Sequence, residues 1–307
     1  MRPPQSALLP EPGPSALFLI LRADPGAAPL ALARALAQLP ALAAKVAALD
    51  PRAKLASALS LGPGLWDRLS PRARPAALRP FRALSGPGGR APATGGDLLL
   101  HLHSRREDLN VELSLCAQSA LGGAVRVEEE VHGFRYLDSR DLTGFIDGTE
   151  NPKGRARAAA ALIGREDARF AGGSYAFTQR YVHDLARWAG LRVPQQEKVI
   201  GRRKRDSLEL SDARKPQDAH IARTAIERDG VELEILRHSF PYARAGEAGL
   251  FFLAYTRDLA IPMEMLARML GTSGDGLHDR LMEYTRAVSG AHFFTPSLAT
   301  LKALARG

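Results

Sequence analysis

Residues 98–115 read LLLHLHSRREDLNVELSL, a run of apolar residues that leads directly into an amphipathic one. The first part is typical of a buried strand, and the second is typical of a helix that ends at residue 121, just before Gly122 and Gly123. Residues 250–266 read LFFLAYTRDLAIPMEML and show the same order of features. One strand-to-helix unit therefore occurs in each half of the chain, which predicts two similar halves.

The two stretches match most closely where strand gives way to helix, at Asp108-Leu109 and at Asp258-Leu259. A carboxylate in this place can accept hydrogen bonds from the free N–H groups of the first helical turn, and it suits the helix dipole. We therefore expect both aspartates to cap the helices that follow them.

The rest of the first half extends this pattern. Strand patterns cover 16–22, 55–61, 97–103 and 124–136, and helix patterns cover 29–49 and 107–121, with a loop and a short helix around Trp66 between them. Pro40 should kink or divide the first helix. The order of elements is typical of an α+β domain, an antiparallel sheet with helices on one face. We predict two such domains, residues 1–136 and 137–307.

The composition suits an ordinary globular surface. The chain has 307 residues, 45% of them hydrophobic, and a net charge of +9. A basic balance can indicate nucleic-acid binding. However, aromatic residues make up only 6%, and the densest basic run, 202–205, has no aromatic residue beside it. We therefore do not expect a nucleic-acid partner.

The cysteine content and the apolar runs bear on the cellular compartment of the protein. Cys116 is the single cysteine, so no internal disulfide can form, and its apolar surroundings predict a buried structural thiol. The apolar run 16–21 is too short for a signal peptide, and we expect no membrane span, because no apolar run approaches the required length. We expect a cytoplasmic protein without a membrane partner.

The most informative stretch is GFIDGTENP, residues 144–152. Gly144 and Gly148 allow unusual backbone angles or the close approach of a flat ligand. Asp147 stands between an apolar residue and a glycine, so its carboxylate could transfer protons in a partly dry pocket. From these residues alone, an ordinary Asp-Gly turn followed by an Asn-Pro breaker is the preferred interpretation.

This nonapeptide resembles the glycine-aspartate-glycine signature of the dye-decolourising peroxidases, in the form seen in the bacterial P-type (B) subgroup. Further stretches resemble the same subgroup in the same order along the chain: 5–11, 132–135, 172–180, 196–201, 237–242 and 293–297. The resemblance implies two ferredoxin-like halves with one haem b per chain, bound in the C-terminal half.

The haem ligand must come from eight histidines. His101 and His103 share one face of a strand and could suggest a metal pair, but two satisfied strand histidines are the preferred interpretation because no third ligand is near. By resemblance, His220 takes the place of the proximal haem ligand. Such an imidazole needs its second nitrogen oriented by a partner, and Asp279 resembles the acidic residue that does this.

The resemblance also implies which residues lie on the face of the haem opposite His220. On its own, Arg237 is an arginine at a strand end, usually solvated or ion-paired. By resemblance it would stabilise the charge on the departing peroxide oxygen, while Asp147 moves the proton. Ser239 matches a small polar position that is asparagine in some relatives. The remaining cofactor contacts implied are Gly148, Thr149 and, at a haem propionate, Arg223.

The implied activity is that of a haem-dependent peroxidase, which reduces hydrogen peroxide and oxidises small organic donors such as dyes and phenols through a ferryl intermediate. Two alternatives stay open: a haem-handling protein on the same scaffold, which needs the His220 pocket only, and a basic nucleic-acid binder. We expect a free cytosolic homo-oligomer. Bulky substrates would need surface electron carriers, for which the second half offers Tyr175, Tyr181, Trp188, Tyr255 and Tyr284.

Overall fold

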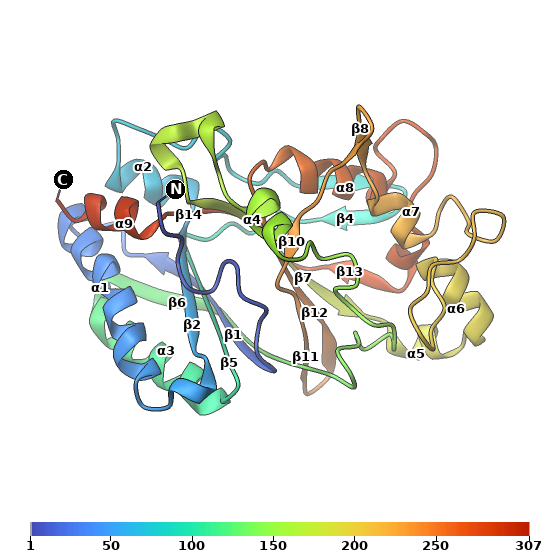
Figure 1. The fold of residues 1–307 in the computed structure, drawn as a ribbon, viewed down its shortest axis with the longest axis horizontal. Helices are drawn as coiled ribbons and strands as arrows, with labels where there is room; N and C mark the ends of the chain where they lie inside the picture. Colours follow the sequence, from blue (N-terminus) through green and yellow to red (C-terminus); the bar gives the residue numbers. More distant parts are fainter. Residues whose placement is uncertain (1, 307) are drawn as a thin grey trace.

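The structure, a computed structural model, describes residues 2–306 and contains one large antiparallel sheet (Figure 1). Eight strands follow the order β10-β12-β7-β14-β2-β5-β1-β6, with β11 (Phe240–Arg244) paired to β12 and β13 (Thr285–Ala287) paired to β7. The two halves of the chain join where β14 (Ala291–Thr295) meets β2 (Ala56–Leu61), through Phe294 and Leu61. The sheet is therefore continuous across both halves.

The first half is an α+β unit of the predicted kind. Its sheet has the order β2-β5-β1-β6, in which the second strand of the chain lies at one edge and the fourth at the other. Residue Leu19 in the central β1 lies opposite Leu100 on one side and Glu130 on the other. The elements of this half are β1 (Ser15–Ala23), α1 (Pro29–Ala47), β2, β5 (Leu98–Ser104), α3 (Glu107–Leu121) and β6 (Val125–Phe134).

The segment between β2 and β5 contains the short helix predicted around Trp66, α2 (Pro63–Leu69), and a small hairpin of β3 (Leu84–Gly86) and β4 (Gly89–Ala91). Helix α1 runs without interruption through Pro40, so the predicted division of this helix is wrong.

The second half repeats the order of the first. Its sheet reads β10-β12-β7-β14, again second, third, first and fourth strand along the chain, so both halves are ferredoxin-like as expected. Its main elements are β7 (Ser174–His183), β10 (Leu236–Arg237), β12 (Glu247–Thr256), α8 (Ala260–Leu270) and β14. Smaller helices are α4 (Arg155–Ala161), α5 (Leu185–Ala189), α6 (Val193–Ile200), α7 (His220–Thr224) and α9 (Leu298–Leu304).

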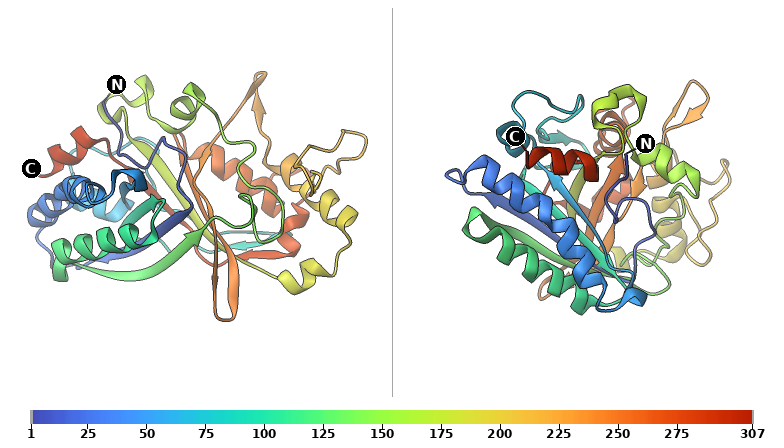
Figure 2. Two further views of the ribbon diagram at one scale, coloured as in Figure 1. Left: turned by 60° about the horizontal axis from the view of Figure 1, so that its bottom comes forward. Right: turned by 60° about the vertical axis from the view of Figure 1, so that its left-hand side comes forward.

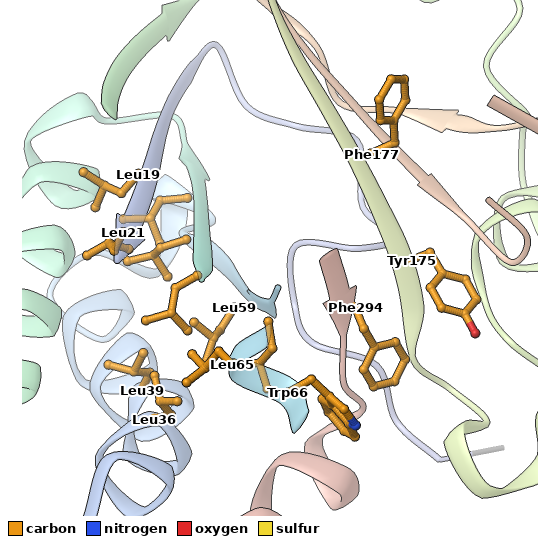
Figure 3. Packing of buried hydrophobic residues seen from close by; sticks show 14 of the residues in the cluster. Leu19, Leu21, Leu36, Leu39, Leu59, Leu65, Trp66, Tyr175, Phe177 and Phe294 are labelled. Carbon is orange, nitrogen blue, oxygen red and sulfur yellow. The ribbon is translucent and has the colours of Figure 1, made fainter. Parts of the chain in front are cut away.

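Strand β1 is buried on both of its faces. In β1, Leu17, Leu19 and Leu21 belong to the core under the helices, part of which Figure 3 shows. The alternate residues Ala16, Phe18 and Ile20 belong to a second core, shared with β12 and β14 of the other half. The rings of Phe18 and Phe251 stack there with centroids 4.3 Å apart. The helix-free faces of the two halves therefore pack on each other, with the helices outside (Figure 2).

Helix α1 qualifies by length and composition as a possible membrane-crossing helix, contrary to the expectation from the sequence. Its buried residues include Leu32, Leu36 and Leu39, which join the core beneath it. Core helices of globular domains meet the same criterion. Of the 18-residue window that meets the criterion, 33% is buried inside the protein.

Two smaller expectations are only partly met. Asp258 accepts a hydrogen bond from the main-chain N–H of Ala260 at 2.9 Å, as predicted, whereas Asp108 pairs with Arg106 and leaves the start of α3 without a side-chain cap. Cys116 is partly exposed rather than buried, and its thiol donates to Glu112 at 3.5 Å.

Candidate active site

Two cavities lie on either side of the 144–152 loop. The larger, of about 410 Å³, is in the second half and falls in the size range of small-molecule sites. Its apolar wall comes from β7, β12 and α8: Phe177, Leu250, Phe252, Pro262, Met265, Leu266 and Met269. The smaller cavity, of about 250 Å³, lies against the N-terminal segment and the end of β6. Asp147, Gly148 and Arg237 line both cavities, so they separate one from the other.

Two histidines line the larger cavity, and their hydrogen bonds distinguish them. His183 uses both ring nitrogens, Nδ1 with Thr285 at 2.7 Å and Nε2 with Asp141 at 3.1 Å. His220 uses only Nδ1, which lies 2.6 Å from the carboxylate of Asp279. Within residues 2–306, Nε2 of His220 has no hydrogen-bond partner. His220 is therefore the cavity histidine with a nitrogen available for a ligand.

Asp279 is held where it can orient that imidazole. The side chain of Asp279 is fully buried, and its second oxygen accepts from the main-chain N–H of Leu281 at 2.8 Å. An ionised carboxylate accepts only, so Nδ1 of His220 carries the proton and Nε2 carries the lone pair. Histidine, tautomer and carboxylate have the arrangement that a haem iron ligand requires.

The 144–152 loop has the backbone angles expected from its glycines. Gly144 and Gly148 have φ values of +87° and +79°, a region that L-residues rarely adopt. A β-carbon on Gly144 would also lie 2.6 Å from Cε of Lys204. Within the loop, the main-chain N–H of Gly148 donates to the carboxylate of Asp147 at 2.6 Å. The turn thus orients the Asp147 side chain.

Asp147 and Arg237 form an ion pair on the wall between the cavities. Nη1 of Arg237 lies 3.4 Å from Oδ1 of Asp147, and each side chain is about a quarter exposed, 24% and 25%. The carboxylate of Asp147 is therefore partly buried and lies beside a cation. The pair combines a proton acceptor and a fixed positive charge at one point.

Asn151, which the sequence suggested only as a chain breaker, connects these two segments. Its side-chain amide donates to the main-chain carbonyl of Arg237 at 2.8 Å and accepts from the N–H of Arg237 at 2.9 Å. Nothing in the sequence indicated this contact, because the two residues are 86 positions apart. The only indication in the sequence that Asn151 has a role at the site was its position in the 144–152 loop.

The other predicted residues are distributed around the site. Thr149 lines the larger cavity, whereas Ser239 lines only the smaller one, where its hydroxyl accepts from the N–H of Leu253 at 3.3 Å. Arg223 lines neither cavity. Its buried guanidinium binds Asp275 with both terminal nitrogens, at 2.7 and 3.1 Å, so the charge of Arg223 is paired within the protein. The cations that line the larger cavity are Arg202, Lys215 and Arg237.

The aromatic residues proposed as surface electron carriers are not at the surface. Tyr175, Tyr181, Trp188, Tyr255 and Tyr284 are all at most 7% exposed. Tyr181 lines the larger cavity and donates to Gln179 at 2.6 Å. A surface route through these five residues therefore lacks an exposed end.

His101 and His103 lie on β5 and line neither cavity, although His238, whose ring lies beside both, lines the smaller one. Both are buried, and each has one ring nitrogen in a hydrogen bond, His101 with Tyr255 at 3.0 Å and His103 with the N–H of Gly13 at 3.4 Å. Their Nε2 atoms have no partner, so the expectation of satisfied strand histidines is half met. Within residues 2–306, no group of three or more His, Cys, Asp or Glu is arranged to hold a metal ion.

The chain is similar to known proteins. The family models described as Dyp-type peroxidase, N-terminal and C-terminal, match residues 5–135 and 138–300. A dye-decolorizing peroxidase of Mycolicibacterium paratuberculosis is 42% identical over 288 residues, which are 93% of this chain and 81% of the relative.

Solved structures agree in fold. A dyp-type peroxidase from Shewanella oneidensis matches with a TM-score of 0.95 at 36% identity over 99% of each chain. DyPB from Rhodococcus jostii RHA1 matches with a TM-score of 0.94 at 40% identity over 97% of each chain. A variant of the latter was solved in complex with heme. Fold and site together define an enzyme of the peroxidase class. The chain belongs to the Dyp-type peroxidase family, as its resemblance in sequence predicted.

Proposed function

We propose that this chain is a haem-dependent peroxidase, in which His220 binds the haem iron and the Asp147–Arg237 pair acts on hydrogen peroxide. The observation that carries the assignment is the contact of 2.6 Å between His220 and the buried Asp279, which leaves Nε2 of His220 to the larger cavity. The electron donors are small organic molecules such as dyes and phenols.

The larger cavity suits one haem b per chain. Its apolar walls match a flat macrocycle, and Gly148 and Thr149 line it beside the signature loop. Arg202 and Lys215, in place of Arg223, are the cations available to the acidic groups of the cofactor. Arg202 also pairs with Glu150, and Lys215 with Glu209, so these cations are held in position.

Haem, when bound, supplies the redox chemistry. The carboxylate of Asp147 accepts a proton from peroxide and returns it to the departing oxygen, and the guanidinium of Arg237 stabilises the negative charge that develops there. Both side chains lie on the wall that the two cavities share. Ser239 lines the smaller cavity, on the side from which peroxide would approach Asp147 and Arg237.

A haem-handling protein would need the pocket of His220 alone. The ion pair of Asp147 and Arg237 on the cavity wall favours the peroxidase, because binding a cofactor requires neither residue to face the smaller cavity.

The domain division, location and assembly are also part of the proposal. A boundary at residues 136/137 is supported by the family models, which end at 135 and begin at 138. A cytoplasmic location is supported by the single cysteine, which cannot form a disulfide within the chain. We propose a homo-oligomer, free in the cytosol.

An absorption spectrum of the purified, haem-loaded protein tests the proposal. We expect a Soret band that changes when hydrogen peroxide is added and returns when a phenolic donor is supplied. A Soret band that peroxide leaves unchanged would support the haem-handling alternative, and the absence of a Soret band would exclude both.

A further inference from the structure

The smaller cavity has a strongly cationic wall. Five cationic side chains line it against two carboxylates, and Asp147 already pairs with one of the five. The cations are Arg135, Arg140, Lys153, Arg157 and Arg237, and the carboxylates belong to Glu11 and Asp147. A concave surface lined by one sign of charge raises the local concentration of ions of the opposite sign.

Most of this positive charge has no ionic partner within the chain. Among residues 2–306, only Arg237 of the five has a carboxylate within 4.0 Å. Arg140 donates to the main-chain carbonyls of Gly144 and Lys204 at 2.7 and 2.8 Å. Such contacts hold a guanidinium in place and leave its net charge uncompensated.

Arg157 is held in the same way. Its Nε donates to the carbonyl of Leu9 at 2.6 Å, and its Nη2 lies 3.5 Å from Nε2 of His238. Burial lowers the pKa of Arg157, which the charge of Glu11 offsets only in part. Arg140 and Arg157 are therefore two cations that main-chain carbonyls hold in position at the cavity. Neither has a carboxylate partner among residues 2–306.

The remaining wall is aromatic and apolar. Phe134 and Tyr136 meet edge to face, with ring centroids 6.4 Å apart, and Phe134 is 36% exposed. Phe240 and three prolines complete this side: Pro12, Pro152 and Pro241. Aromatic side chains beside cations in one cavity favour a ligand that is both aromatic and negatively charged.

We propose that the smaller cavity binds a small aromatic anion, such as an aryl carboxylate, aryl sulfonate or phenolate. Its ring would pack on the aromatic side, and its charge would face the guanidinium groups of Arg140 and Arg157. The volume of about 250 Å³ is sufficient for one substituted benzene ring. The inference rests on the proposed function only in naming this anion as a reducing substrate of the enzyme.

The first experiment uses a matched pair of probes that peroxidases do not oxidise, benzenesulfonate and neutral benzenesulfonamide. Their dissociation constants for the haem-loaded protein are measured by calorimetry at low and high salt. We expect the sulfonate to bind more tightly than the sulfonamide, with an advantage that salt reduces. Equal binding of the two probes, or binding that shifts the Soret band because the anion sits at the iron, would overturn the proposal.

The second experiment reverses two exposed cations of the wall that hold no ion pair within residues 2–306, in the double variant Arg135→Glu/Lys153→Glu. We expect benzenesulfonate to bind about tenfold more weakly, since each reversed exposed charge contributes a few-fold, and benzenesulfonamide to bind as before. The matched control is Lys45→Glu/Lys302→Glu, which reverses two exposed lysines that line neither cavity. An unchanged affinity for the sulfonate in the double variant would contradict the assignment.

These outcomes are separable from those of the proposed function. The binding measurements contain no peroxide, so a failure of anion binding leaves the roles of His220, Asp147 and Arg237 untouched. Conversely, if an Arg237→Leu variant reacted with peroxide at the parent rate, the proposed role of Arg237 in the peroxidase reaction would be refuted. The result on anion binding would not be affected.

Discussion

The side chain of Asn151 holds the main chain of Arg237 through two hydrogen bonds, one donated at 2.8 Å and one accepted at 2.9 Å. The pairing resembles one rung of a β-ladder made by a side-chain amide. It ties the loop that contains Asp147 to the strand that presents Arg237. The distance of 3.4 Å between the two charged groups therefore depends on Asn151.

Replacing Asn151 should disturb the peroxide reaction without removing the cofactor. Asn151→Asp keeps the acceptor for the N–H of Arg237 and loses the donor to its carbonyl, so we expect a slower reaction with peroxide at normal haem content. Misplacing a group by about 1 Å can cost on the order of 10²-fold in rate. Stopped-flow absorbance measures the rate. A parent rate in both Asn151→Asp and Asn151→Ala would show that the contact does not position Arg237.

Arg237→Leu should bind haem and react with peroxide about 10²–10³-fold more slowly, since one preorganised charge at the departing oxygen is lost. The Soret change after mixing with peroxide measures this rate. Arg82→Leu, a change at an exposed arginine that lines neither cavity, is the control. Equal rates in Arg237→Leu and the parent would remove Arg237 from the mechanism.

Asp147→Asn should have a smaller effect than Arg237→Leu, because water or Arg237 can perform part of the proton transfer. If the carboxylate sets the acid limb of the pH–rate profile, that limb should vanish in the variant. The peroxide rate is measured from acid to neutral pH in parent and variant. Superimposable profiles would mean that Asp147 mainly shapes the loop through its bond to the N–H of Gly148.

His220→Ala should lose haem or retain it weakly, because the pocket would then lack its available nitrogen. Haem content and the Soret band measure the effect, and His183→Ala is the matched control, since both nitrogens of His183 are already engaged within the protein. Asp279→Asn should keep haem but raise its reduction potential, because a neutral amide makes the imidazole of His220 a poorer donor. Normal haem content in His220→Ala would refute the ligand assignment.

The buried histidines should make the fold sensitive to acid. Burial lowers the pKa of His103 to about 4, and burial together with neighbouring positive charges lowers the pKa values of His101 and His238 as well. Below a pH of about 6.5 the unfolded chain binds these protons and the folded chain does not, so stability should fall as the pH falls from about 6.5 toward 4.

Each such histidine contributes up to about 1.4 kcal/mol per pH unit in this window. Urea unfolding of haem-loaded protein at several pH values measures the slope. In His103→Gln the slope should decrease by roughly one histidine's share. A slope equal to that of the parent would show that His103 is not among the groups that couple stability to pH.

The sequence by itself determined the two halves. Apolar and amphipathic runs at 98–115 and 250–266 impose a strand followed by a helix, since each periodicity buries its apolar residues in only one kind of element. The same local logic predicted the positive φ values of Gly144 and Gly148, because these angles depend on a residue and its immediate neighbours.

The tertiary structure decided what depends on distant partners. The chemistry of the residues left eight histidines open, and resemblance pointed to His220. Only the folded chain shows that both ring nitrogens of His183 are hydrogen-bonded within the protein. His220 uses one nitrogen, in a hydrogen bond with Asp279, 59 positions away. In the same way, Arg223 pairs with Asp275, and Asn151 contacts Arg237. Hydrogen bonds and ion pairs between remote segments depend on how the two sheets pack, and no local pattern of residues records that packing.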